Sequence, residues 1–192
     1  MKSTQISIFL FSILICFSTN NTSYANSESM TLEDVKASLK TAGEHRFVYR
    51  MFFKLYDARL RTDAEQTQDV DQLLNGKNTL LLEFDYLRKI KKSIILESSG
   101  KILANNMTPA ELDLIQGRVD QINAAYRTVD RGDRSALSYV PGKGTTLWIN
   151  EMPIITIEGE DFARLYFRIW LGENPISKPM REALVQSSFN KE

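Results

Sequence analysis

Apolar and polar residues alternate over several short stretches of the chain, and this period of two predicts β-strands. Residues 134–157, RSALSYVPGKGTTLWINEMPIITI, carry turn residues at Pro141 to Gly144 and at Asn150-Glu151, which predicts three short antiparallel strands in a meander. Residues 43–61, GEHRFVYRMFFKLYDARLR, are rich in aromatics and predict two strands or one long bent strand. The apolar run NTLLLEFDYL, residues 78–87, predicts a central strand that is covered on both faces.

Apolar residues three and four positions apart predict helices in other parts of the chain. The clearest helix follows Thr108, which caps it, with Pro109 in the first helical position and Glu111 completing a capping box. The segment KIKKSIILESSGKIL before it also has helical spacing. The apolar stripe of the clearest helix predicts that it packs on something flat, and it consists of Leu112, Ile115, Val119, Ile122 and Tyr126.

Three further helices are expected near the two ends of the chain. A short one is capped by Thr31 and stops at Gly43, one runs from about Glu160 to Leu171 with Gly172 as its stop, and a last one opens at Ser177. Strands and helices thus come in blocks rather than in strict alternation. This order predicts an α+β fold, an antiparallel sheet with a layer of helices packed on one face.

The first residues have the pattern of a sorting signal. Lys2 is followed by the apolar run ISIFLFSILICF and then by polar residues that end in SYA. We therefore expect a signal peptide over residues 1–25, a periplasmic or secreted location, and a single domain over residues 26–192. The apolar run is shorter than the roughly 20 residues that span a bilayer, so we expect no integral membrane span.

Charge and cysteine content exclude several classes of partner and cofactor. The 24 basic and 24 acidic residues balance, which argues against nucleic acid or an anionic membrane as the main partner. The single cysteine, Cys16, lies in the expected signal peptide, and His45 is the single histidine. Since neither a thiolate cluster nor a His cluster can form, we expect no metal and no cofactor.

The segment PGKGTT, residues 141–146, invites comparison with a phosphate-binding loop. Such a loop needs a leading Gly where this chain has Leu137, then Gly-Lys-Ser/Thr, then a helix. Here Gly142-Lys143 is followed by Gly144 and by a predicted strand. The segment is therefore predicted to be a hairpin turn, and Lys143 a solvated turn residue.

Arginines stand among aromatic residues on the first predicted strand pair. Arg46, Arg50, Arg59 and Arg61 accompany Phe47, Tyr49, Phe52, Phe53 and Tyr56. An arginine that reaches into an aromatic-lined space can hold a carboxylate by bidentate contacts. The alternative is that these arginines extend from the sheet edges into solvent.

Four segments resemble the exported bacterial branch of the chalcone isomerase-like family: GEHRFVYRMFFKLYDARL, LLLEFDYLRKIKK, VDRGDRSALSYVPGKGTTLWIN and GEDFARLYFRIWLGENPISKPMREAL. The resemblance implies an antiparallel sheet backed by helices, with a ligand cleft between them. The family holds enzymes that cyclise chalcones and relatives that bind fatty acids without catalysis. Arg46 is the nearest counterpart of the arginine that orients the substrate in the enzymes. The threonine position of the enzymes falls on Lys54, and their tyrosine position falls within Ile90 to Lys92, which has neither Tyr nor Thr.

These departures favour binding over catalysis. The first hypothesis is a non-catalytic protein that binds a small apolar acid or lipid, such as a fatty acid, in the cleft between sheet and helices. Its candidate ligand-binding residues are Arg46, Arg50, Tyr49, Lys54 and Tyr56, and no catalytic residue is assigned. The alternative is an isomerase or lyase that acts on an enone-like substrate, with Arg46 stabilising an enolate and Lys54 or Lys91 replacing the missing hydroxyls. A third alternative is an envelope interaction protein whose cleft is filled by its own side chains.

Overall fold

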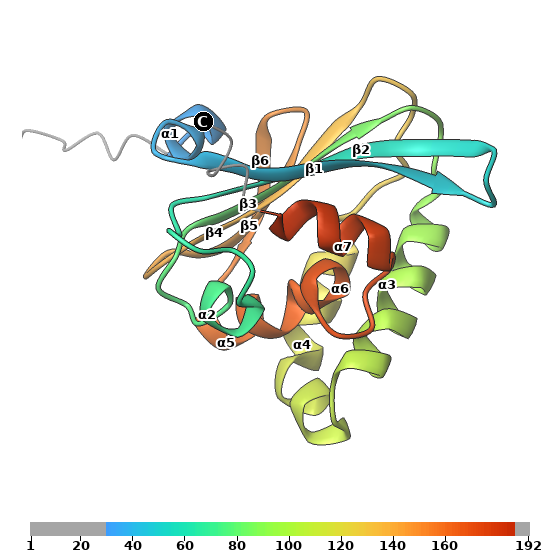
Figure 1. Ribbon diagram of the computed structural model, residues 1–192. Coiled ribbons are helices and arrows are strands. Elements are labelled where there is room, and N and C mark those ends of the chain that lie inside the picture. Colours follow the sequence, from blue (N-terminus) through green and yellow to red (C-terminus); the bar gives the residue numbers. More distant parts are fainter. Residues whose placement is uncertain (1–29, 187–192) are drawn as a thin grey trace, which may run out of the picture.

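A six-stranded antiparallel sheet forms the frame of the molecule (Figure 1). The structure is a computed structural model and describes residues 30–186. The strands follow one another across the sheet in chain order, and each pairs with its sequence neighbour. The expected signal peptide and its end at Ala25 lie outside the described residues and stay predictions. The strands are β1 (Lys40–Tyr49), β2 (Phe53–Thr62), β3 (Leu80–Tyr86), β4 (Arg134–Val140), β5 (Gly144–Ile149) and β6 (Met152–Ile157).

Helices cover one face of this sheet, below it in Figure 1, so the predicted α+β fold is confirmed. The long pair α3 and α4 forms the connection between β3 and β4, and the other covering helices follow β2 or end the chain. The covering helices are α2 (Val70–Leu73), α3 (Lys92–Asn106), α4 (Pro109–Ala125), α5 (Glu160–Tyr166), α6 (Arg168–Leu171) and α7 (Lys178–Val185).

The capping signals in the sequence locate the helix starts correctly. The Thr108 side chain accepts a hydrogen bond from the backbone N–H of Glu111 at 3.2 Å, and the Glu111 carboxylate accepts one from the backbone N–H of Thr108 at 2.9 Å. Three residues of the predicted stripe, Ile115, Val119 and Ile122, point into the core and are buried. Because these side chains lie on one side of α4, burying them holds the helix flat against its neighbours.

The two faces of the sheet carry cores of different size. Leu80 and Leu82 of β3 point into the large core between the sheet and the helices, whereas Leu81 points the other way into a small cluster with Trp148 and Leu32. The short helix α1 (Leu32–Lys36) supplies part of that cluster. The prediction that this strand is covered on both faces is therefore confirmed at Leu81.

The expected helix stop at Gly43 is wrong, because α1 ends at Lys36 and Gly43 lies inside β1. Because Gly43 has no side chain, another element can approach its backbone closely. A Cβ atom at this position would lie 1.9 Å from the carbonyl oxygen of Ala183 in α7. Gly43 therefore allows α7 to pack directly on the backbone of the edge strand.

The segment PGKG is the predicted turn between β4 and β5. Gly142 has a φ of 74°, a conformation that glycine adopts without steric cost, and the Lys143 N–H donates to the Val140 carbonyl at 2.9 Å. The chain continues from this turn into β5 and not into a helix. This geometry agrees with the hairpin prediction and not with a phosphate-binding loop.

Candidate functional site

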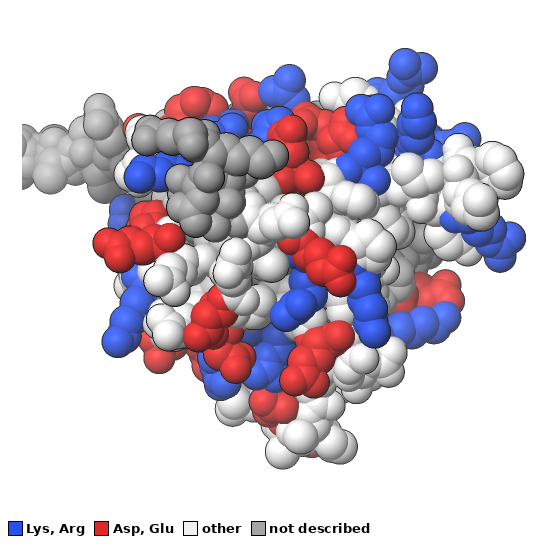
Figure 2. All heavy atoms as spheres, viewed as in Figure 1, with Lys and Arg blue, Asp and Glu red and all other residues white. Residues whose placement is uncertain are grey.

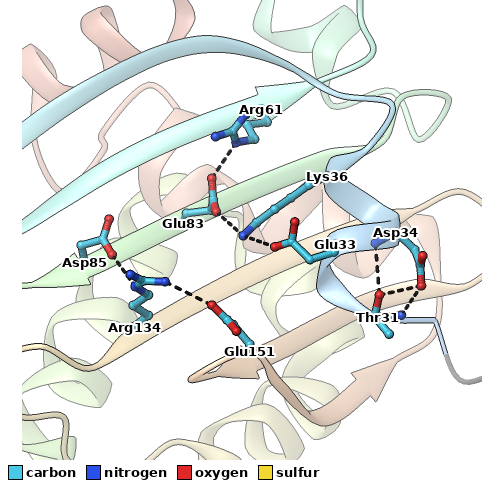
Figure 3. A network of polar contacts seen from close by, with 9 residues as sticks. All are labelled: Thr31, Glu33, Asp34, Lys36, Arg61, Glu83, Asp85, Arg134 and Glu151. Carbon is cyan, nitrogen blue, oxygen red and sulfur yellow. Dashed lines mark hydrogen bonds and ion pairs between the residues drawn. The ribbon is translucent and has the colours of Figure 1, made fainter.

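A polar hollow lies on the face of the sheet opposite the long helices, beside α1. Glu83 sits at its centre and accepts contacts from Arg61 at 2.8 Å and from Lys36 at 3.2 Å (Figure 3). Arg134 bridges Asp85 and Glu151 at 3.2 and 3.1 Å in the same view. Because these charges neutralise one another, the hollow of about 210 Å³ offers little to a charged ligand.

A larger, apolar cavity of about 520 Å³ lies between the sheet and the helices. Strands β1 to β3 form its floor, and α3 and α6 form its walls. Its size and lining are those of a site for a small organic molecule. The apolar and aromatic side chains around it are Phe47, Tyr49, Leu55, Tyr56, Phe84, Tyr86, Ile90, Ile94, Ile95, Tyr126, Ile169, Trp170 and Ile176.

Aromatic rings hold the floor of this cavity in place. Tyr56 lies 5.1 Å from Phe47 and meets Phe84 edge to face at 5.3 Å, both measured between ring centroids. Phe84 in turn lies 5.5 Å from Trp170 on α6. Such contacts between rings on separate elements fix the shape of the wall more firmly than aliphatic packing would.

Hydroxyl groups supply the buried polar part of the lining. The Tyr86 hydroxyl on β3 and the Ser135 hydroxyl on β4 form a hydrogen bond of 2.9 Å, and both residues are buried. Burial raises the pKa of Tyr86 to about 12, although the hydrogen bond with Ser135 acts in the opposite direction. Burial also raises the pKa of Tyr56 and of Tyr126. These hydroxyls therefore stay protonated at neutral pH. Tyr126 shares a hydrogen bond with Tyr166, whereas the Tyr86–Ser135 pair keeps one proton that it can donate to a ligand.

Charged groups occur in the lining only at its solvent-exposed edge, as far as the described residues go. Lys101 and Glu97 on α3 form an ion pair of 2.7 Å, with side chains that are 72% and 61% exposed. No arginine and no histidine belongs to the lining residues. The cavity is thus an apolar space with neutral hydrogen-bond donors inside and one ion pair at its edge.

Known proteins with a similar sequence or fold identify the family and the fold of this chain. The family model described as chalcone isomerase-like matches residues 20–185. The chain belongs to the chalcone isomerase-like family. Among solved structures, it resembles a fatty-acid binding protein of Arabidopsis thaliana (AtFAP1) with a TM-score of 0.58 and 15% identity, over 78% of this chain and 87% of that one. This likeness shows the shared fold. The search of curated proteins finds no match.

The chalcone isomerase-like fold brings two of the five candidate ligand-binding residues to the cavity. Tyr56 is buried in its floor, and Tyr49 lies at the end of β1, where it is 47% exposed and still lines the space. That either residue contacts a ligand stays a prediction.

The three cationic candidates lie outside this lining. Arg46 projects from the opposite face of β1 and makes a bidentate pair with Asp57 at 2.6 and 2.7 Å. Lys54 and Arg46 line a shallow surface hollow with Phe52, and Arg50 lies in the turn after β1, where its Nε donates to the Tyr49 hydroxyl. The counterpart of the family's substrate-orienting arginine therefore faces away from the cavity.

Sequence reasoning missed the residues that give this chalcone isomerase-like cavity its polar lining. Tyr86 ends the central strand and reads as core, Tyr126 reads as part of the apolar stripe of the helix after Thr108, and Ser135 belongs to no catalytic or binding motif. Their proximity depends on the pairing of β3 with β4 and on the position of α4. The available signal was a tyrosine that follows Leu82 and Phe84 on the same face of β3.

Proposed function

We propose that this chalcone isomerase-like protein binds a small apolar acid or lipid, such as a fatty acid, in the cavity between sheet and helices. One observation carries the proposal: a cavity of about 520 Å³, lined mostly by apolar and aromatic side chains, also contains the buried hydroxyls of Tyr86 and Ser135. An acyl chain fits the apolar wall, and a carboxyl or ester group can accept from the hydroxyls. The fatty-acid binding protein with the same fold supports this assignment of ligand class.

The lining favours binding over catalysis. A general base needs a pKa near the working pH, but burial raises the pKa of Tyr56, Tyr86 and Tyr126. The one lysine in the lining, Lys101, is exposed and paired with Glu97. We infer from the apolar run at residues 6–17 that the protein is exported, in keeping with the bacterial branch that it resembles.

The direct test is to extract the purified protein with organic solvent and identify the released molecules by mass spectrometry. We expect a fatty acid or a related lipid, and we expect added fatty acid to raise the melting temperature. Ligand at about 100 times its Kd stabilises a protein by about 2.7 kcal/mol. An empty protein that shows no rise in melting temperature with any fatty acid would refute the proposal.

A pair of variants on one helix locates the site. Ser98 lines the cavity, and its hydroxyl donates to the Ile94 and Ile95 carbonyls of its own helix, whereas Ser93 on the same helix is exposed. Ser98→Phe should occupy part of the cavity and weaken fatty-acid binding, and Ser93→Phe should leave it unchanged. Equal affinities for the two variants would place the ligand elsewhere.

A further inference from the structure

The turn between β1 and β2 holds two large apolar side chains in solvent. Met51 is 87% exposed and Phe52 is 82% exposed. The hairpin that carries them extends beyond the helices on the right of Figure 1, and Figure 2 shows uncharged atoms at this end with Lys and Arg around them. We call residues 48–54 the hairpin tip. Two neighbouring, highly exposed apolar side chains on a protruding turn are typical of an interaction site.

The backbone of the hairpin tip is also unusual. Arg50 and Met51 have φ values of 48° and 65°, in the left-handed region that Gly, Asn and Asp adopt most readily. The turn between β5 and β6 has the same geometry but begins with Asn150, which suits it. The hairpin tip thus keeps Arg50 and Met51 where Asn or Gly would fit the backbone better.

Positive charge surrounds the apolar end. A shallow hollow beside Phe52 is lined by Lys54, Arg88 and Arg131, and Arg50 lies in the turn itself. Within residues 30–186, none of these four cations forms an ion pair with a carboxylate. Arg88 lies over the ring of Phe53 at 4.9 Å, which places its guanidinium directly at the base of the tip.

The nearby carboxylates do not cancel this charge. Asp57 is engaged by Arg46 and Asp130 by Lys89, so each neutralises a further cation of the same region. A chain with balanced total charge therefore carries a local excess of positive charge at the hairpin tip. Such an excess attracts a surface that bears many negative charges.

From these observations we propose that the hairpin tip docks on a lipid bilayer that contains anionic lipids. Met51 and Phe52 enter the boundary between headgroups and acyl chains, and Arg50, Lys54, Arg88 and Arg131 contact the anionic headgroups. A small apolar end ringed by cations suits a membrane surface better than a protein partner, because a stable protein interface buries about 800 Å² on each side. Tyr49 belongs both to the hairpin tip and to the cavity lining, so docking brings the cavity edge to the bilayer.

Binding of the full chain to vesicles tests the proposal. The vesicles contain equal amounts of phosphatidylcholine and phosphatidylglycerol, and pure phosphatidylcholine serves for comparison. We expect binding to the anionic vesicles that weakens with salt, and a loss of about tenfold in affinity for Met51→Ser/Phe52→Ser and for Lys54→Glu/Arg88→Glu. The apolar run at residues 6–17 is common to all variants, so its contribution cancels in the comparison.

The opposite edge of the sheet provides a matched control. Met152 and Ile154 on β6 are 64% and 45% exposed, and Met152→Ser/Ile154→Ser should bind vesicles like the wild type. Phe52→Trp adds a direct readout, since lipids with brominated acyl chains should quench this tryptophan beyond any quenching of the wild type, whose Trp148 and Trp170 are both buried.

Three outcomes would overturn the proposal. These are wild-type affinity in Met51→Ser/Phe52→Ser, no added quenching in Phe52→Trp, and a dimer in solution that depends on Met51 and Phe52. The dimer would identify a second copy of the chain as the occupant of the hairpin tip. None of these readouts involves a ligand in the cavity, so failure of docking and failure of the proposed function remain distinguishable.

Discussion

Replacing Tyr86 by phenylalanine separates the structural role of the cavity hydroxyls from their role in binding. The hydroxyls of Tyr86 and Ser135 lie 2.9 Å apart, and the two residues are 8% and 7% exposed. Tyr86→Phe keeps the ring and removes one partner of this hydrogen bond. The Ser135 hydroxyl then loses its hydrogen-bond partner at a position that is buried from solvent.

The expected loss of stability follows from that geometry. An unpaired buried polar group costs about 1–3 kcal/mol, and a hydrogen bond between neutral groups is at the lower end, about 1–2 kcal/mol. In a domain of about 150–250 residues each kcal/mol lowers the melting temperature by about 2–4 °C, so Tyr86→Phe should melt about 2–8 °C earlier. Tyr86→Phe/Ser135→Ala removes both partners and should melt close to the wild type.

Ligand affinity provides the second measurement. If a carboxylate accepts from these hydroxyls, Tyr86→Phe should weaken binding of a fatty acid about tenfold or more, because hydrogen bonds to charged groups contribute about 1.5–3 kcal/mol. The methyl ester of the same acid should lose less. The fluorescence of Trp170, which lines the cavity, reports binding, whereas Trp148 lies on the other face of the sheet.

Tyr139→Phe is the matched control for this experiment. Its hydroxyl also makes one hydrogen bond, to the Gly76 carbonyl at 2.9 Å, but it lies outside the cavity lining. It should lower stability and leave ligand affinity unchanged. Unchanged fatty-acid affinity in Tyr86→Phe would refute the assignment of the carboxylate to this hydroxyl pair.

Three further changes test other parts of the structure. Gly43→Ala should lower the melting temperature by several degrees because it forces α7 off β1, while Gly100→Ala, with open space at its Cβ, should be neutral or raise stability by about 0.5–1 kcal/mol. Arg46→Ala should keep wild-type fatty-acid affinity, and a loss of binding without loss of stability would show that this side chain reaches the ligand. The Asp161 pKa lies below its ordinary value through the hydrogen bond from Arg118, so the pair stabilises the fold above about pH 4 and this contribution disappears as the pH falls further. Melting curves of Asp161→Asn should therefore depend less on acid than those of the wild type.

Local sequence patterns were enough to predict most of the framework. The meander of β4 to β6, the capped helix α4 and the final helices each have a local cause, namely turn residues, a capping box or an apolar stripe. Gly43 was misread because the same residue that ends helices also permits close packing, and only the position of α7 distinguishes the two uses.

The candidate site was harder to predict because it depends on which face of a strand each side chain occupies. β1 contains two irregularities in its pairing with β2, one of them between Phe47 and Val48. The sequence of β2 nevertheless indicates which residues share a face, since the charged residues Asp57 and Arg59 alternate with Tyr56 and Ala58. Arg46 pairs directly opposite Asp57, which places it on the polar face.

The total charge of the chain does not reveal how the charges are distributed over the fold. A count of charged residues argued against an anionic membrane as the main partner, because 24 positive and 24 negative groups cancel. Among residues 30–186, the fold gathers Lys54, Arg88 and Arg131 beside the hairpin tip, whereas Glu83 and Asp85 on β3 are paired with cations elsewhere on the sheet. Charge distribution therefore becomes informative only when the strand pairing is known.

The order of strands in the sheet has a consequence for how the chain folds. Strands β1 to β3 and strands β4 to β6 each pair with their sequence neighbours; short turns join β1 to β2 and β4 to β6, and residues 63–79 join β2 to β3, so each set has comparatively local contacts. Joining the two sets requires closure over the α3–α4 connection, the longest between neighbouring strands of the sheet, which makes the β3–β4 seam the most entropically demanding pairing. The hydrogen bond between the Tyr86 and Ser135 hydroxyls crosses this seam. A ligand held there binds neither half alone, and it would act by slowing the separation of the two halves rather than by speeding their formation.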